Sequence, residues 1–357
     1  MMEDEVVRRR RWLTREEFLD YLGATNLIPG PNSTELAIHL GHARAGWPGL
    51  LVAGASFILP AALIVWVIAW IYVRYRALPG AAALLYGIKP VVIAVVAQAL
   101  WGLGRTAMKS TALGLLGIVA VVAVLAGVHE LIVLAAAGLV MGTSAIAFRS
   151  DGSQTRAMVA IKAGASSKIV AAVSATAAAT AAVPFSLGSL FVVFVKIGSV
   201  LFGSGYVLLA LLRADFVQRL GWLTEQQLLD AVAIGQMTPG PLFTTATFIG
   251  FILGGSAGAA IATIGIFLPA FVFVAISGPL VPRLRRSPFA GGVLDGVNIA
   301  SLALMTVVSW QLARAAIIDV STLVMALVSV VALVHYRVNS VWLVIAGGAL
   351  GWLLMKV

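Results

Sequence analysis

Residues 12–34, WLTREEFLDYLGATNLIPGPNST, decide the fold, because they recur almost intact as residues 222–244, WLTEQQLLDAVAIGQMTPGPLFT. Trp12, Asp20 and the triplet Pro29-Gly30-Pro31 all meet the same residues 210 positions later. After a gap of one residue the match continues at an offset of 209, which aligns Gly87 with Gly296 and Leu59-Pro60-Ala61 with Leu268-Pro269-Ala270. Self-similarity at a fixed offset indicates internal duplication. The chain therefore consists of two homologous halves.

The triplets Pro29-Gly30-Pro31 and Pro239-Gly240-Pro241 predict a helix break in each half. Proline lacks an N–H donor and disfavours helical geometry in the residue before it. The flanking segments, 16–28 and 32–42, then 225–237 and 243–253, are too short to cross a bilayer alone. We therefore expect a pair of half-helices meeting at each triplet inside the membrane, where irregular backbone is tolerated if it is buried or lines a watery cavity.

The composition is that of a membrane protein. Of 357 residues, 61% are hydrophobic and 11% are charged, and the mean hydropathy is +1.03, whereas soluble domains carry about 25% charged residues. Apolar blocks predict membrane spans over 50–70, 91–103, 112–128 and 131–148, then 190–212, 257–277, 299–308, 320–334 and 341–354. The predicted fold class is all-α, a polytopic membrane protein.

The net charge of +10 agrees with the rule that basic residues gather on the cytoplasmic side of membrane proteins. With the N-terminus in the cytoplasm and one crossing per apolar block, sixteen Lys and Arg lie on the cytoplasmic side and six on the other. This predicts a multi-pass protein of the inner (plasma) membrane. The charge then requires no nucleic-acid partner.

Five predicted spans separate Trp12 from Trp222, and an odd number turns the second copy upside down. We therefore predict an inverted repeat, a plan in which transporters bind substrate near the bilayer midplane. The predicted parts are a first repeat over 1–150 that lacks an opening helix, a cytoplasmic linker over 151–186 and a second repeat over 187–357. Residues 161–183 would make the repeats parallel if they formed a span, but the polar stretch before them favours a linker.

The segment after each triplet carries side chains suited to an anion. Asn32, Ser33 and Thr34 open the helix in the first half, and Thr244 and Thr245 do so in the second, at positions typical of N-caps. Free N–H groups and the positive end of the helix dipole converge there, and helix starts of this kind bind anions. The alternative is that each triplet only kinks a helix. The hydroxyl in both copies favours a substrate site.

Five further residues are candidates for the transport path. Lys89 and Lys196 lie in apolar segments, where an ionised lysine needs a partner, an aqueous cavity or a route to the headgroups. Glu35 is the candidate for proton coupling, or is simply a first-turn acid that the helix dipole stabilises. Gly203 and Gly205 allow close backbone approach, either for substrate or for helix packing.

Several function classes are excluded. The chain contains no cysteine, which excludes disulfides, thiolate metal sites and thiol redox chemistry. Its histidines form no ligand pattern, no glycine-rich stretch has the spacing of a nucleotide site, and residues 1–18 lack the apolar core of a signal peptide. We therefore predict a transporter rather than an enzyme, with no cofactor and no metal, whose uphill transport draws on an ion gradient.

NLIPGPNSTELAIHLGHARAGWPGLLVAGASFILPA, from Asn26, and FVKIGSVLFGSGYVLLALL, from Phe194, resemble the two halves of the chromate ion transporter (CHR) family, as do both copies of the repeated motif. The resemblance covers nearly the whole chain. It implies an inner-membrane exporter that expels chromate by using the proton gradient. The departure is the opening helix, where family members carry a glycine-rich F-G-G-P-type segment.

Two other transport functions stay open. One is a carrier for sulfate or another tetrahedral oxyanion that also accepts chromate, and the other is a passive anion channel. A chromate-reducing enzyme would need a flavin, a haem or a thiol, and the sequence has neither a cysteine nor a nucleotide fingerprint. The sequence does not distinguish a monomer from a homodimer.

Overall fold

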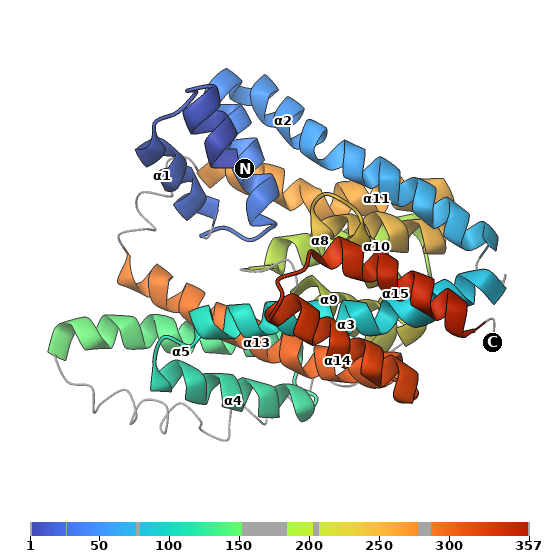
Figure 1. Cartoon of the computed structure of the whole chain (residues 1–357). Helices are drawn as coiled ribbons and strands as arrows, with labels where there is room; N and C mark the ends of the chain where they lie inside the picture. The colour runs from blue at the N-terminus through green and yellow to red at the C-terminus, as the bar shows by residue number, and fades with distance from the viewer. Residues whose placement is uncertain are drawn as a thin grey trace.

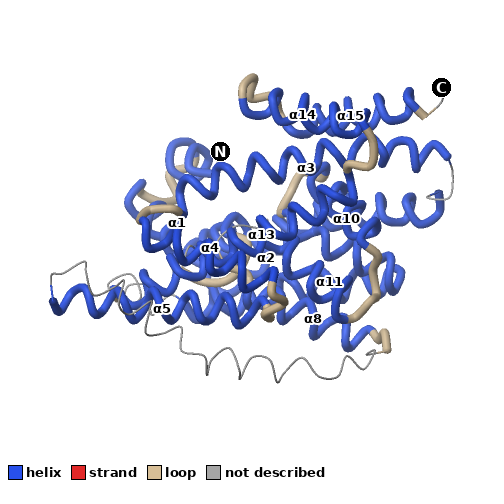
Figure 2. Tube along the Cα trace, turned by 90° about the horizontal axis from the view of Figure 1, so that it is seen from below, coloured by secondary structure: helices blue, strands red, loops and turns tan. Residues whose placement is uncertain are grey.

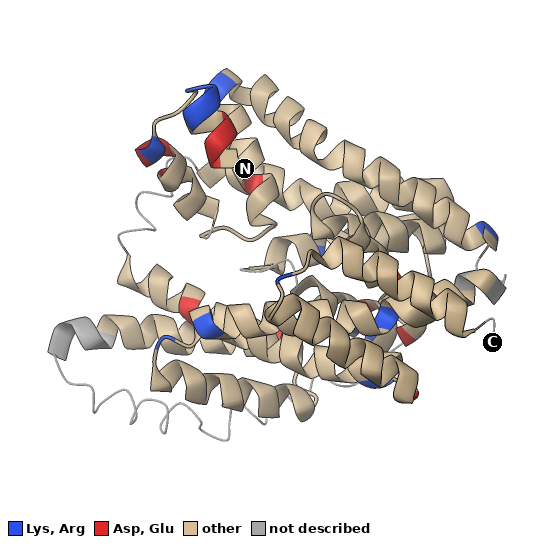
Figure 3. Cartoon of the chain, in the orientation of Figure 1, with Lys and Arg blue, Asp and Glu red and all other residues tan. Residues whose placement is uncertain are grey.

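The computed structural model describes residues 2–25, 27–75, 79–151, 184–202, 207–277 and 287–355, which form helices joined by short turns, with no strand among them (Figure 1). Four of these helices are long and apolar enough to cross a membrane: α2 (Asn32–Tyr75), α3 (Pro79–Ala107), α11 (Thr245–Ser277) and α13 (Pro288–Ala316). Charged residues gather at the N-terminal segment and at a few other points, and most of each long helix is uncharged (Figure 3). The predicted all-α polytopic class is confirmed.

The two halves carry matching elements. In the first half, η1 (Asp4–Arg9) and α1 (Arg15–Thr25) precede α2, and α4 (Thr111–Leu125) and α5 (Glu130–Asp151) follow α3. In the second half, η3 (Arg213–Arg219), α10 (Glu225–Met237) and η4 (Leu242–Thr244) precede α11, and α14 (Val320–Val334) and α15 (Ser340–Leu354) follow α13. α3 and α13 have 29 residues each, and α4 and α14 have 15 each. Both pairs begin 209 positions apart, so the duplication extends to the helix boundaries.

α2 and α11 each contain a sharp reversal that divides the helix into two arms. The chain turns at Gly46, with a φ of 60°, and at Gly255, with a φ of 59°, a conformation that glycine adopts without strain. The second arm then folds back on the first. A Cβ atom at Gly41 would overlap the carbonyl oxygen of Gly49, and the glycine pair 209 positions later makes the same contact. The predicted spans over 50–70 and 257–277 are therefore the second arms of two helical hairpins.

The halves are interleaved. α3 packs against α14 and α15 of the second half, and α13 packs against α4 and α5 of the first (Figures 1 and 2). Small residues allow the close approach, as is common between membrane helices. A Cβ atom at Gly87 would overlap the carbonyl oxygen of Gly347, and one at Gly296 would overlap that of Ala137. The two repeats consequently share one core.

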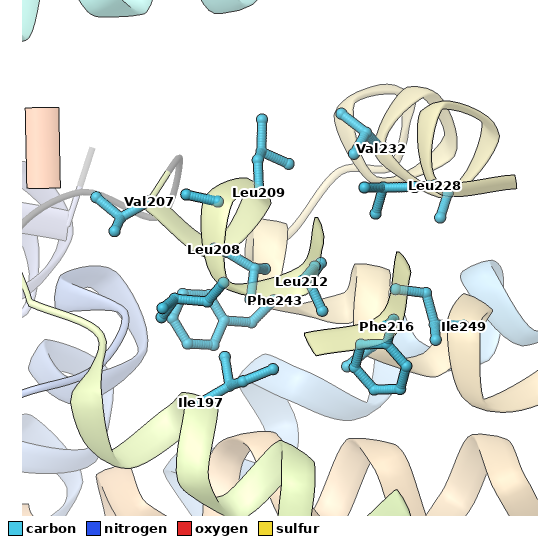
Figure 4. Close-up of a cluster of buried hydrophobic side chains, with 14 of the residues drawn as sticks. Ile197, Val207, Leu208, Leu209, Leu212, Phe216, Leu228, Val232, Phe243 and Ile249 are labelled. Carbon is cyan, nitrogen blue, oxygen red and sulfur yellow. The ribbon is translucent and has the colours of Figure 1, made fainter. Parts of the chain in front are cut away.

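The second half opens with α8 (Leu187–Val200) and α9 (Val207–Leu212). The prediction of one continuous span over 190–212 is wrong, because the backbone becomes extended at Leu201 and its carbonyl accepts a hydrogen bond from the N–H of Gly30 at 2.7 Å. All six residues of α9 are buried, and they belong to the same hydrophobic cluster as Ile197 of α8 and Phe243 of η4 (Figure 4). Most of the predicted linker, 152–183, lies outside the described residues.

Candidate functional site

The triplet Pro29-Gly30-Pro31 separates α1 from α2 and is buried. Gly30 has a φ of 144°, which favours glycine, and its N–H is held by Leu201. A Cβ atom at Gly30 would overlap Oε1 of Glu35 and would lie 3.6 Å from the Cβ of Ala270. The predicted helix break is present, and it places the start of α2 inside the protein against α8 and α11.

The triplet Pro239-Gly240-Pro241 separates α10 from η4 and α11 in the same way. Gly240 has a φ of 147°, and a Cβ atom there would overlap the Cβ of Ala61. Ala61 and Ala270 end the two Leu-Pro-Ala motifs, so each triplet packs against the motif of the opposite half. Unlike the first triplet, this one exposes Pro239 and Gly240.

The side chains that follow the first triplet are polar, and two of them are completely buried. Asn32 is half-buried and Ser33 is exposed, whereas Thr34 and Glu35 are both 0% exposed. Among the described residues, none forms a hydrogen bond with the Thr34 hydroxyl or with either carboxylate oxygen of Glu35. An unpaired carboxylate in such a place is costly as an anion, and ionisable groups within membrane segments usually serve function.

The hydroxyls that follow the second triplet have partners. Thr244 donates to the carbonyl of Pro241 at 2.9 Å, and Thr245 donates to that of Leu242 at 2.8 Å. The expectation that these threonines cap the helix is wrong, because Pro241 occupies the N-cap and places both threonines inside the first turns. A direct role for either hydroxyl in binding substrate stays a prediction.

A cavity of about 630 Å³ opens beside the first triplet, and we call it the Asn32 cavity. Its volume is in the range of small-molecule sites, which is about 300–1,000 Å³. Asn32 lines it together with Asn298 and Ser301 of α13. Ser301 is only 3% exposed and its hydroxyl has no hydrogen-bond partner among the described residues. Lys109 also lines the cavity and forms an ion pair with Asp295 at 2.7 Å. Asp295 lines the cavity as well and offsets the Lys109 charge, so the amide and hydroxyl donors are the groups that suit a small anion.

Lys89 lies in a different cavity, of about 340 Å³, which we call the Lys89 cavity. Its Nζ is 2.9 Å from Oδ1 of Asp230 and donates to Oε1 of Gln226 at 2.6 Å. The Tyr72 hydroxyl donates to the other oxygen of Asp230 at 2.7 Å. Lys89 thus has the partner that its burial requires, and the structure does not bring it together with Asn32.

Lys196 belongs to a network of ion pairs between the halves. Its Nζ is 2.5 Å from Oδ1 of Asp215, and Arg219 is 3.1 Å from the same oxygen. Arg219 also contacts Glu130 of α5 and Nε2 of His129, at 2.9 Å each. Burial lowers the pKa of His129, and the Arg219 charge lowers it further, so a neutral ring accepts this hydrogen bond. Lys196 lines neither the Asn32 cavity nor the Lys89 cavity.

The remaining candidates, Gly203 and Gly205, lie outside the described residues. Their described neighbours Phe202 and Val207 line the Asn32 cavity. In the described part of the chain, no three His, Cys, Asp or Glu side chains gather as a metal site would require.

Comparison with known proteins identifies the family of the chain. The sequence model described as "Chromate transporter" matches residues 1–143 and 188–352. The chain belongs to the chromate transporter family. It is 30% identical to the chromate transport protein of Cupriavidus metallidurans over 98% of this chain and 86% of that protein. It is also 30% identical to the chromate transport protein of Pseudomonas aeruginosa, over 99% of this chain and 86% of that protein.

A more distant relative is an uncharacterized transporter of Methanocaldococcus jannaschii, 22% identical over 99% of this chain and 89% of that protein. No solved structure matches the chain. The family match confirms the resemblance seen in the sequence. As a member of the chromate transporter family, the chain is a multi-pass membrane transporter and not an enzyme.

Sequence reasoning missed several polar residues of this member of the family. Asp230 had a signal, since it is an acid that recurs with Asp20 in the duplicated motif. Tyr72, Asn298 and Ser301 had none, because none of these residue types recurs at the matching position of the other half. Only the tertiary arrangement shows that Asn298 and Ser301 line the same cavity as Asn32.

Proposed function

We propose that this transporter exports chromate across the inner membrane and draws on the proton gradient to do so. The family and its members named for chromate transport support the substrate. The Asn32 cavity supports a small oxyanion. The side chains of Asn32, Asn298 and Ser301 and the N–H groups at the start of α2 would donate hydrogen bonds to its oxygens. Lys109 would supply positive charge on exchanging Asp295 for the anion.

The proposal of proton coupling rests on the burial of Glu35. Its carboxylate is completely buried, has no described partner and lies one helical turn after Asn32, which lines the cavity. A carboxyl group in that position is costly when charged and gains stability when water or a cation reaches it. Glu35 would therefore carry the proton, and Thr34, buried beside it, would offer a further hydroxyl to the anion.

We also propose that the N-terminus is cytoplasmic and that the repeats have opposite orientations. The start of α3 and the end of α13 line the Lys89 cavity, whereas the end of α3 and the start of α13 line the Asn32 cavity. These matching helices run antiparallel, which supports an inverted repeat. Accessibility tags inserted at Gly152 and after Val357 should report the cytoplasm and the outside, respectively. Two tags on the same side would contradict the inversion.

Inside-out vesicles test the transport itself. Vesicles that contain the protein should accumulate radiolabelled chromate when their interior is acid, and should lose most of this uptake when the pH gradient is dissipated. Vesicles from cells without the protein are the control. Equal uptake in the two preparations would overturn the proposal.

Two added arms separate the alternatives. Excess sulfate should compete weakly, and strong competition would make sulfate or a general tetrahedral oxyanion the substrate. Vesicles preloaded with unlabelled chromate should take up labelled chromate faster than empty ones, because only a carrier exchanges one molecule for another. Equal rates would indicate a passive channel.

A further inference from the structure

The Asn32 cavity and the Lys89 cavity are related by the internal repeat. Each is lined by the first half of a long helix, α13 in one case and α3 in the other. The α3 residues that line the Lys89 cavity are Ala82, Leu85, Tyr86 and Lys89. The α13 residues 209 positions later all line the Asn32 cavity: Gly291, Leu294, Asp295 and Asn298.

The residues on the opposite wall of each cavity are also related by the internal repeat. Ala315 and Ala316, at the end of α13, line the Lys89 cavity, and Thr106 and Ala107, at the end of α3, line the Asn32 cavity. These residues are again 209 positions apart. The two cavities therefore lie at opposite ends of the antiparallel pair formed by α3 and α13, as copies of one surface.

The two cavities differ in the side-chain interactions that join the helices around them. At the Lys89 cavity, Asp230 of α10 is only 5% exposed and is tied to Lys89 of α3 and to Tyr72 of α2, so helices of both halves are joined. At the Asn32 cavity, the residue in the place of Lys89 is Asn298, and Asp20, in the place of Asp230, is exposed on α1. The pair that joins the halves there, Lys109 with Asp295, has side chains 62% and 35% exposed, against 16% and 7% for Lys89 and Asp230, and exposed ion pairs contribute little. The cavity with the buried ion pair is the smaller, at about 340 Å³ against about 630 Å³.

We propose that the two cavities are the two ends of one anion path, open in alternation, and that Lys89, Asp230 and Tyr72 form the closed gate of the second end. Transporters built from inverted repeats alternate access by moving one repeat against the other around a fixed site. When the gate opens, α10 leaves α3 and Lys89 is released as a cation for the passing oxyanion. The identity of that anion rests on the proposed function, but the gate does not.

The absence of cysteine from the native chain allows a direct test. Leu294→Cys and Leu85→Cys place single thiols at matching positions of the Asn32 and Lys89 cavities. A membrane-impermeant maleimide is added to intact cells or to inside-out vesicles, without chromate. We expect Leu294→Cys to react quickly and from one side only, and Leu85→Cys to react slowly and only from the other side.

Opening the gate should reverse this difference. Asp230→Asn removes the negative charge that pairs with Lys89, and losing an interaction with a charged group shifts an equilibrium by about 10- to 150-fold. Labelling of Leu85→Cys should rise at least about tenfold, the low end of that range, and labelling of Leu294→Cys should fall. Asp20→Asn, at the matching exposed position, is the control and should not raise labelling of Leu85→Cys.

Tyr72→Phe keeps the ion pair and should change the labelling rates of both thiols in the same directions as Asp230→Asn, by a smaller factor. It provides the test if the Asp230→Asn protein does not reach the membrane. Labelling of both thiols from the same side would overturn the proposal. So would unchanged rates in a folded Asp230→Asn or Tyr72→Phe protein. Labelling requires no transport. If the protein does not transport chromate but shows this reversal of labelling rates, the proposed substrate is wrong and the proposed gate stands.

Discussion

The two Pro-Gly-Pro triplets have nearly the same glycine conformation, but the helix starts that follow them differ in chemistry. Gly30 and Gly240 differ by only 3° in φ, at 144° and 147°. In the first half the next four residues are Asn32-Ser33-Thr34-Glu35, and in the second they are Leu242-Phe243-Thr244-Thr245. Glu35 is buried without a described partner, whereas the hydroxyl of Thr245, its counterpart, donates to a carbonyl.

The surroundings of the two triplets differ as well. The first triplet is buried and bonded to Leu201, while the second exposes Pro239 and Gly240. Duplication has thus kept the geometry that breaks the helix and has given the polar atoms to one copy. We infer that the first helix start handles the ions, and that the second supplies packing around Phe243.

The largest expected effect is that of Glu35→Gln. The amide keeps the shape of the side chain but cannot exchange a proton, so an acid interior should no longer drive chromate accumulation in inside-out vesicles. Exchange of labelled for unlabelled chromate should persist. Thr245→Ala, at the matching position, should reduce accumulation far less, because its hydroxyl already has a backbone partner. Equal losses in the two variants would break the comparison.

The packing role of the second copy is tested by Phe243→Ala. Phe243 is 0% exposed, and truncation of a buried phenylalanine costs about 3–5 kcal/mol. Its counterpart Ser33 is exposed, and Ser33→Ala should stay within about 0.5 kcal/mol of the parent protein. Thermal unfolding in detergent, followed by circular dichroism, measures both. Similar melting temperatures would mean that the two helix starts are packed alike.

Thr34→Ala and Thr244→Ala address the matching hydroxyls. If the Thr34 hydroxyl binds the anion, its loss removes a hydrogen bond to a charged group, worth about 1.5–3 kcal/mol, or about 10- to 150-fold in affinity. Thr244 already donates to Pro241, so Thr244→Ala should weaken chromate binding less. The half-saturating chromate concentration in vesicles is the measurement. A larger effect at Thr244 would reverse the assignment of the ion-handling copy.

The smallest expected effect concerns the glycines of the triplets. Gly240→Ala would overlap the Cβ of Ala61, and overpacking of this kind costs about 1–3 kcal/mol. The double variant Gly240→Ala with Ala61→Gly should recover part of the lost thermal stability. Gly30→Ala instead overlaps Glu35, so Ala270→Gly should give no such recovery. Recovery in both pairs would show that the two triplets have the same surroundings.

The sequence predicted those elements whose ends are fixed locally. The segment 225–237 coincides with α10, because Thr224 and Gln227 form a capping box at one end and the triplet follows the other. The block 320–334 coincides with α14, which Asp319 caps. The block 190–212 was misread, because its break at Leu201 depends on a hydrogen bond from Gly30, distant in the chain.

Contacts between the two halves could not be predicted from sequence patterns. The reversals at Gly46 and Gly255 require one arm to fold onto the other, and a glycine in the sequence is equally consistent with ordinary packing. The pairing of Lys89 with Asp230 joins residues that no local periodicity relates. The candidate site could therefore be placed at Asn32 and Glu35, but its wall on α13 could not.

The interleaving of the halves has a consequence for how the protein is made. Gly87 of α3 meets Gly347 of α15, which is synthesised 260 positions later. At about 5–20 residues per second, α3 waits roughly 10–50 s after its own synthesis before its partner emerges. During that interval, lipid tails must fill the groove that a helix backbone will occupy. The apolar sequence of α3 has to hold it in the bilayer alone, and ribosome pausing between the repeats would prolong the wait.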